Sequence, residues 1–130
     1  MTDKQTETPA LVSVIVPCHN YGHFLSETLD SLIAQTYPHW ECLVIDNGSE
    51  DNTVEVAKQY MQADKRFVIY SIPLSTTSRT RNFGIARSKG QFVLFLDSDD
   101  QIAASKLEKS IKILSEHVDA SLALFAQQVL

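Results

Sequence analysis

The stretch Phe92-Val93-Leu94-Phe95-Leu96-Asp97-Ser98-Asp99-Asp100 joins an apolar run directly to a concentrated negative charge. An unbroken run of strand-forming hydrophobic residues predicts a strand covered on both faces, as in a parallel sheet. Carboxylates this close repel one another, and a hard divalent cation shared with a substrate's phosphates removes that cost. An acidic turn that caps the next helix explains the same residues without any ligand. The rest of the chain must distinguish a metal site from a turn.

Outward from that stretch, apolar runs alternate with segments of helical periodicity. Strands are predicted at residues 11–16, 40–45, 67–72, 92–96 and 121–125, and helices at residues 24–35, 52–63, 80–89 and 104–117. This alternation predicts right-handed βαβ crossovers. The fold class is therefore α/β: a parallel-rich sheet with βαβ crossovers and helices on both faces, in a Rossmann-like arrangement. Apolar spacing places these side chains on the inner faces of the first two helices: Phe24, Leu25, Leu29, Leu32, Ile33, Val56, Ala57, Tyr60 and Met61.

The length and composition describe one ordinary domain. The 130 residues suffice for a single hydrophobic core, with 44% hydrophobic and 21% charged residues. We expect residues 1–10 to be a disordered lead-in and residues 11–130 to form the domain. The chain stops soon after a predicted core strand, with no polar tail. We therefore expect the domain to be the front part of a longer protein.

Charge and hydropathy argue against several partners and locations. The net charge is −5 and there is no Lys/Arg stripe, so we expect no binding to nucleic acid. No apolar stretch approaches the ~20 residues of a membrane span. Cys18 and Cys42 are too few for a disulfide scaffold, so we expect reduced thiols in a cytoplasmic protein. A longer protein would work there or at the cytoplasmic face of a membrane.

Polar residues follow three predicted strands at their carboxyl ends, where open α/β sheets bind ligands. They are residues 17–20 (Pro-Cys-His-Asn), 46–49 (Asp-Asn-Gly-Ser) and 97–100. Asp46 could accept the N–H of a nucleobase, whereas residues 46–51 could also form a turn and a helix cap. His19 is either a surface residue or an imidazole that stacks on a base. The clustering of polar residues at one sheet edge favours a functional site.

Phosphate binding would have to rely on a metal ion and arginine. No Walker-type loop and no G-x-G-x-x-G fingerprint is present. Arg81 lies near a predicted helix start, where its guanidinium could bind a diphosphate through two nitrogens. His19 and His23 have no further ligand at zinc spacing, so a zinc site is not indicated.

Taken together, these motifs resemble those of the family 2 glycosyltransferases, which have the GT-A fold. The matching stretches are residues 12–17 with Asn20, residues 43–51, residues 81–86 and residues 90–100. The resemblance spans about residues 11–125. Each motif is weak alone, but their order and spacing together are specific.

The resemblance implies a nucleotide-sugar donor, commonly a UDP-sugar, bound with Mg²⁺ or Mn²⁺. Asp97-Ser98-Asp99 would be the D-x-D motif, with Asp99 as the direct metal ligand and Asp97 assisting or binding the ribose. Asp46 would read the base and Arg81 would approach the donor. The implied nucleotide-sugar-binding residues are Pro17, His19, Asn20, Asp46, Asn47, Arg81, Asp97 and Ser98, and the implied metal ligands are Asp97 and Asp99.

Some features depart from the family pattern. Asn47 stands where many members carry a second Asp, and His19 stands where Tyr is common, which leaves the preference for base and donor open. In this family the general base that deprotonates the acceptor hydroxyl is an acidic residue well beyond the D-x-D, so it would lie after Leu130. We therefore expect a metal-dependent, inverting glycosyltransferase of which this chain mainly binds donor. The acceptor, whether a glycan, a lipid-linked molecule or another compound, is not indicated.

Two other classes fit parts of the pattern. A haloacid-dehalogenase-like phosphatase also places D-x-D after an apolar strand, but a Gly-Thr pair normally follows, and here the next residues are Asp100-Gln101-Ile102. A receiver-like signalling module, which is not catalytic, has a similar length and alternation. It needs an acidic pair after its first strand, where this chain has Cys18-His19-Asn20.

Overall fold

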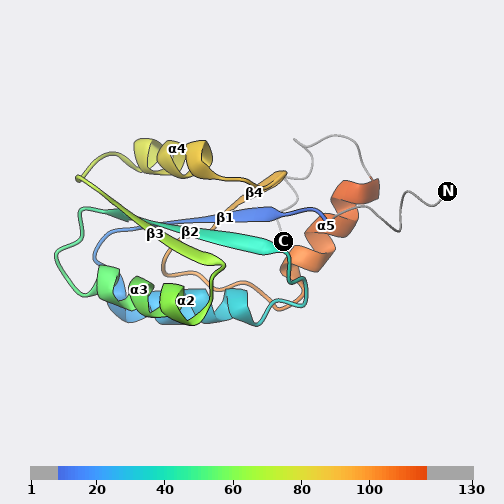
Figure 1. Ribbon diagram of the computed structural model, residues 1–130, viewed down its shortest axis with the longest axis horizontal. Helices are drawn as coiled ribbons and strands as arrows, with labels where there is room; N and C mark the ends of the chain where they lie inside the picture. Colours follow the sequence, from blue (N-terminus) through green and yellow to red (C-terminus); the bar gives the residue numbers. More distant parts are fainter. Residues whose placement is uncertain (1–8, 117–130) are drawn as a thin grey trace.

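The structure is a computed structural model that describes residues 9–116 (Figure 1). The elements in chain order are β1 (Val12–Cys18), α2 (Gly22–Ile33), β2 (Trp40–Asn47), α3 (Thr53–Ala63), β3 (Phe67–Ile72), α4 (Thr77–Arg87), β4 (Phe92–Phe95) and α5 (Lys106–Glu116). The predicted strand at residues 121–125 and most of the predicted lead-in lie outside the described residues.

All neighbouring strands of the described sheet run parallel, in the order β3-β2-β1-β4. Val12 at the start of β1 lies opposite Trp40 of β2 on one side and Phe92 of β4 on the other. Helices α2 and α3 cover one face of the sheet, and α4 covers the other (Figure 1). The connection through α4 therefore carries the chain from β3 past β2 and β1 to the opposite edge. This arrangement confirms the predicted α/β class and puts the topological switch point between β1 and β4.

The core has two layers, one on each face of the sheet. The layer under α2 and α3 contains Leu25, Leu29 and Leu32, all fully buried, and the layer under α4 contains Ile15, Leu43 and Ile45. Gly84 lets α4 approach the sheet closely, because a Cβ there would lie 2.7 Å from Cγ2 of Ile15.

Three predicted inner positions are wrong. Phe24, Ile33 and Met61 are 43%, 46% and 36% exposed. The buried stripe of α2 follows Leu25, Leu29 and Leu32, and in α3 Ala57 is buried. The apolar side chains at the margins of these stripes turn toward solvent, because a helix buries only one face against a sheet.

The ends of several elements differ from the prediction. Helix α4 begins at Thr77 rather than at residue 80, because the hydroxyl of Thr76 accepts the N–H of Arg79 at 3.1 Å and caps the helix. Strand β2 continues to Asn47, and β1 continues through Pro17 to Cys18, still paired with β2.

Pro17 explains why β4 ends one residue earlier than predicted. The C=O of Ile15 accepts the N–H of Leu96 at 2.9 Å, so this side of β1 faces β4. Pro17, two residues later, faces the same way but has no N–H to donate. The hydrogen-bond ladder between β1 and β4 stops there, and the two strands can separate at the switch point.

Candidate functional site

A cavity of about 280 Å³ opens where β1 and β4 separate. We call it the switch-point cavity. The residues that line it come from the ends of β1, β2 and β4 and from the first turn of α4: Pro17, Cys18, His19, Tyr21, Asn47, Thr77, Thr80, Asp97, Ser98 and Asp99. The cavity thus occupies the position at which open α/β sheets bind their ligands.

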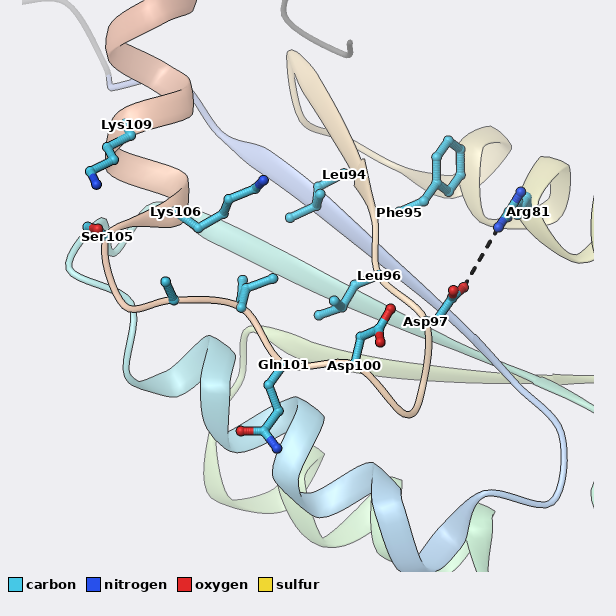
Figure 2. Close-up of a pocket in the computed structure, with 12 residues that line it drawn as sticks. Arg81, Leu94, Phe95, Leu96, Asp97, Asp100, Gln101, Ser105, Lys106 and Lys109 are labelled. Carbon is cyan, nitrogen blue, oxygen red and sulfur yellow. Dashed lines mark ion pairs between the residues drawn. The ribbon is translucent and has the colours of Figure 1, made fainter. Parts of the chain in front are cut away.

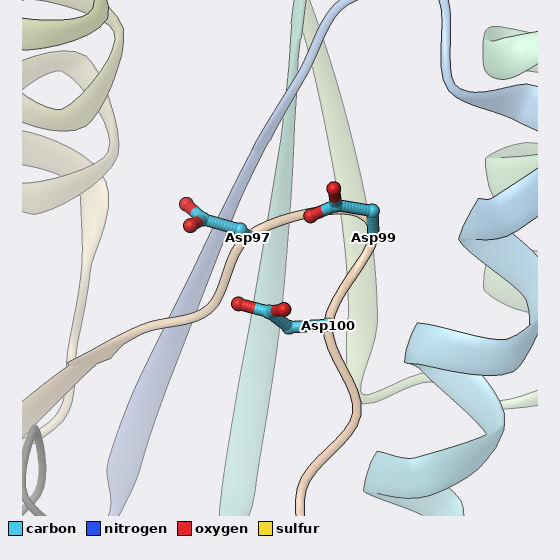
Figure 3. A group of neighbouring side chains, drawn as sticks. All are labelled: Asp97, Asp99 and Asp100. Carbon is cyan, nitrogen blue, oxygen red and sulfur yellow. The ribbon is translucent and has the colours of Figure 1, made fainter.

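The acidic loop after β4 brings three carboxylates together on the border of this cavity. Ligand oxygens of Asp97, Asp99 and Asp100 lie within 4.8 Å of one another, and all three residues are exposed (Figure 3). The loop is also a turn, since the N–H of Asp100 donates to the C=O of Asp97 at 3.0 Å. The turn and the metal-site interpretations are therefore compatible, because the turn produces the convergence.

The electrostatics of this loop favour a cation. Desolvation raises the pKa of Asp100, and the negative charges of Asp97 and Asp99 raise it further. A set of convergent carboxylates fits a hard divalent ion such as Mg²⁺ or Mn²⁺, which prefers oxygen ligands. Ser98 anchors this loop to the body of the protein. It is only 3% exposed, and its backbone C=O accepts a hydrogen bond from the hydroxyl of Thr28 in α2 at 2.9 Å.

Asp46 and Asp51 organise the turn that follows β2. Asp46 is 4% exposed, does not line the switch-point cavity, and accepts the N–H of Ser49 through Oδ1 at 3.2 Å. Asp51 accepts the N–H and the hydroxyl of Thr53, and the hydroxyl bond lowers the pKa of Asp51. The structure thus confirms a turn at residues 46–51, and Asp51 binds the first N–H of α3, although the N-cap residue of this helix is Asn52. The predicted contact between Asp46 and a base stays a prediction.

Asn47 and His19 connect the loops around the cavity. The amide of Asn47 donates to the C=O of Ser75 at 2.9 Å and accepts the N–H of Ser75 at 2.7 Å. The backbone C=O of Asn47 lies 2.7 Å from Nδ1 of His19. Asn20, predicted to line the nucleoside pocket, is instead directed toward the turn after β2, where Oδ1 accepts the N–H of Glu50 at 2.8 Å.

Arg81 contacts Asp97 but does not line the switch-point cavity. Its Nη2 is 3.7 Å from Oδ1 of Asp97, and its guanidinium lies 5.4 Å from the ring centre of Phe95 (Figure 2). Arg81 and Asp97 border a second cavity of about 530 Å³, which extends along β4 to Lys106 at the start of α5. The predicted approach of Arg81 to a diphosphate stays a prediction.

Four residues of the cavity wall were not among the predicted site residues: Cys18, Tyr21, Thr77 and Thr80. Thr77 and Thr80 belong to the first turn of α4; the sequence pattern placed Thr77 in a loop and Thr80 at the helix start. The cap formed by Thr76 is the signal that could have located this helix start. Burial and the charges of Asp46 and Asp51 raise the pKa of the Cys18 thiol to about 12, so Cys18 lines the cavity as an uncharged side chain.

Among the helices of residues 9–116, none combines the length and the apolar content that crossing a bilayer requires.

Comparison with known proteins identifies the family. Residues 13–127 match the family model described as glycosyl transferase family 2. The putative teichuronic acid biosynthesis glycosyltransferase TuaG of Bacillus subtilis is 38% identical over 112 residues, which cover 85% of this chain and 44% of TuaG. The chain thus spans less than half of the length of this relative.

Solved structures show the same fold. TarS 1–349 of S. aureus in complex with UDP aligns with a TM-score of 0.71 and 33% identity, covering 82% of this chain and 32% of the TarS 1–349 chain. The mannosyltransferase PcManGT of Pyrobaculum calidifontis, in complex with GDP-Man and Mn²⁺, aligns with a TM-score of 0.73 at 24% identity, over 83% of this chain and 33% of that one. The parallel sheet, the motifs and the family match together show that the chain belongs to glycosyl transferase family 2.

Proposed function

We propose that this chain is the donor-binding part of a metal-dependent, inverting glycosyltransferase that uses a UDP-sugar. The observation that carries the proposal is the convergence of Asp97, Asp99 and Asp100 on the border of the switch-point cavity. A UDP donor is supported by the similarity to TarS, which is 33% identical to this chain and whose structure is a complex with UDP. The family match leaves the phosphatase and receiver alternatives without support.

The nucleoside would occupy the switch-point cavity. Pro17 and His19 would form its wall on the β1 side, and Ser98 on the β4 side. Asn20, Asp46 and Asn47 would hold the surrounding loops in place through the hydrogen bonds described above.

The diphosphate would lie beside the acidic loop. Asp97 and Asp99 would hold Mg²⁺ or Mn²⁺, with Asp99 as the direct ligand and Asp97 assisting or binding the ribose. The bound ion supplies positive charge that stabilises the departing nucleoside diphosphate. The contribution of this chain is to fix the carboxylates through the turn at residues 97–100 and the anchor at Ser98.

Arg81 would add positive charge to the diphosphate. Its ion pair with Asp97 is long, and the two side chains are 42% and 59% exposed, so the pair is weak and can exchange. A metal ion that neutralises Asp97 would free the guanidinium to bind phosphate oxygens.

Catalysis would need residues beyond this chain. An inverting transfer requires a general base at the acceptor hydroxyl, and we assign that base to a part of a full-length protein after Leu130. This chain would then bind donor without efficient transfer, and the acceptor could be a glycan, a lipid-linked molecule or another compound. A cytoplasmic location is part of the proposal.

Calorimetric titration of the chain with UDP, GDP and ADP tests the proposal. We expect UDP to bind in the presence of Mn²⁺ and to bind much more weakly with EDTA. Thermal unfolding provides a second readout, because UDP at about 100 times its Kd should add about 2.7 kcal/mol of stability. Failure of both UDP and GDP to bind with Mn²⁺ present would contradict the donor-binding function.

A further inference from the structure

The hydrogen bond at Nδ1 of His19 defines where that ring carries its proton. Nδ1 lies 2.7 Å from the backbone C=O of Asn47, and a carbonyl oxygen can only accept. Nδ1 must therefore be the donor. In the neutral ring this leaves Nε2 unprotonated, with a lone pair available for a donor.

The amide orientation of Asn20 is determined in the same way. One atom of its amide group faces the backbone N–H groups of Glu50, at 2.8 Å, and Asp51, at 3.4 Å. Only the oxygen can accept from these donors, so the NH₂ group must be the atom that lies 3.3 Å from Nε2 of His19. An N–H donor thus meets an unprotonated nitrogen, and each assignment supports the other.

We propose that Asn20 is a positioning residue that holds His19 by Nε2, so that His19 offers only its ring face to the nucleotide. This inference rests on the proposed function, because it assumes that a nucleoside occupies the switch-point cavity, which His19 lines and Asn20 does not. Asn47 holds one ring nitrogen and Asn20 holds the other. Neither nitrogen remains for the edge of a base.

The backbone of Asn20 is built for this role. Its φ is 57°, a left-handed conformation that Asn tolerates better than most residues. Its N–H donates to the hydroxyl of Ser49 at 2.9 Å. Backbone and side chain of Asn20 therefore both bind the turn after β2, which connects the β1 loop rigidly to the β2 loop and fixes the position of the amide beside His19.

The consequence concerns specificity. A base that stacks on His19 gains affinity from contact with the ring face, and such stacking tolerates every base. His19 would therefore strengthen nucleotide binding without selecting uracil, and selection would fall to other groups.

Nitrogen-15 NMR of the histidine rings in the free chain, at mildly alkaline pH, tests the hydrogen bonds. We expect a protonated Nδ1 and an unprotonated Nε2 whose resonance is shifted by an N–H donor. Asn20→Gly keeps the left-handed backbone and should remove that shift. Asn20→Asp keeps the acceptor for Glu50 but puts a carboxylate at Nε2, which should favour a proton there. Glu50→Gln, the control in the same turn, keeps the backbone N–H that Asn20 accepts and changes only an exposed side chain, so it should leave the His19 signals unchanged.

Titration with UDP and Mn²⁺ tests the functional part. Asn20→Gly should weaken binding by about twofold to tenfold, the loss expected for one hydrogen bond. His19→Phe keeps an aromatic face but loses both ring hydrogen bonds, so it should lose about as much UDP affinity as Asn20→Gly, whereas His19→Ala should lose at least about fivefold more, because stacking is also lost. His19→Leu should resemble His19→Ala.

Two results would overturn the inference: a protonated Nε2 in the unsubstituted chain, or equal losses of UDP affinity in His19→Phe and His19→Ala. The NMR readout needs no nucleotide. A chain with the expected His19 signals that binds no UDP would therefore contradict the proposed function, while the hydrogen-bond assignment would stand.

Discussion

The side-chain amide of Asn47 makes two hydrogen bonds to the backbone of Ser75, as a peptide group of a neighbouring strand would. It donates to the C=O of Ser75 at 2.9 Å and accepts its N–H at 2.7 Å. The pair connects the end of β2 to the loop before α4, and so it fixes one wall of the switch-point cavity. Only a side-chain amide can make both bonds, because a carboxylate has no donor.

The first prediction follows from this pairing. Asn47→Asp should lower the free energy of unfolding by about 1–3 kcal/mol, since the C=O of Ser75 loses its donor and faces a negative charge. Denaturant titration measures the loss. Asn52→Asp is the matched control: Asn52 is the N-cap of α3 and makes no side-chain capping bond, so its replacement should cost nothing. Equal effects of the two replacements would contradict this role of Asn47.

The second prediction concerns the acidic loop. Asp99→Asn should weaken Mn²⁺-dependent UDP binding by at least about tenfold, because even residues that only support metal ligands cost about that much when replaced. Its thermal stability should stay nearly unchanged, because Asp99 is exposed. Glu55→Gln, an exposed carboxylate on α3, should change neither quantity. UDP affinity that keeps its dependence on Mn²⁺ in Asp99→Asn would exclude Asp99 as a ligand.

The third prediction concerns the close approach of Gly90 to β1. A Cβ at Gly90 would lie 2.6 Å from Oγ of Ser13 and 2.7 Å from the C=O oxygen of Leu11. The oxygen of Leu11 belongs to the backbone and cannot rotate away, so Gly90→Ala should destabilise the fold by about 1–3 kcal/mol. Lys89→Ala, at the exposed neighbouring position, should have little effect on unfolding by denaturant.

The fourth prediction concerns alkaline pH. Burial, with the charges of Asp46 and Asp51, raises the pKa of Cys18 from 9.0 to about 12, and burial raises the pKa of Cys42 as well. The folded state therefore holds these protons more tightly than the unfolded state. Stability should be unaffected by these thiols below about pH 9 and should decrease as the pH rises from there toward 12.

Unfolding free energies measured across that pH window test this expectation. Cys18→Ala should show a shallower decrease than the unsubstituted chain. Alkylation offers an independent check: a shift of this size reduces the thiolate fraction of Cys18 by roughly a thousandfold, so iodoacetamide should modify the folded chain far more slowly than the unfolded one. Equal alkylation rates in the two states would contradict a buried, protonated Cys18.

The sequence was enough to predict the fold class and the edge of the sheet at which the polar strand ends gather. Continuous apolar runs indicated parallel strands, and parallel strands bring their polar ends to one edge, as the positions of Asp97, Asp99 and His19 confirm. The sequence could not predict what the side chains of Asn20 and Asn47 bind. Their partners, Glu50 and Ser75, are far along the chain and come close only through the order of the strands.

Helix faces and helix starts were predicted less well for a different reason. Spacing alone cannot tell where the apolar stripe of α2 ends, which is why Phe24 was placed inside although it is 43% exposed. Thr77 was missed as a cavity residue because the start of α4 depends on a single capping bond from Thr76.

The position of β4 also has a consequence for how the site comes into existence. β4 joins the sheet beside β1, so its pairing closes a loop that contains most of the described chain. Such contacts between distant segments carry a high entropic cost and form slowly. The ends of β1, β2 and β3 can assemble from adjacent βαβ units, but the acidic loop reaches them only when β4 has docked. A nucleotide and its cation would therefore bind only chains in which β4 has paired with β1. Donor binding would thus report the fraction of chains that have completed folding.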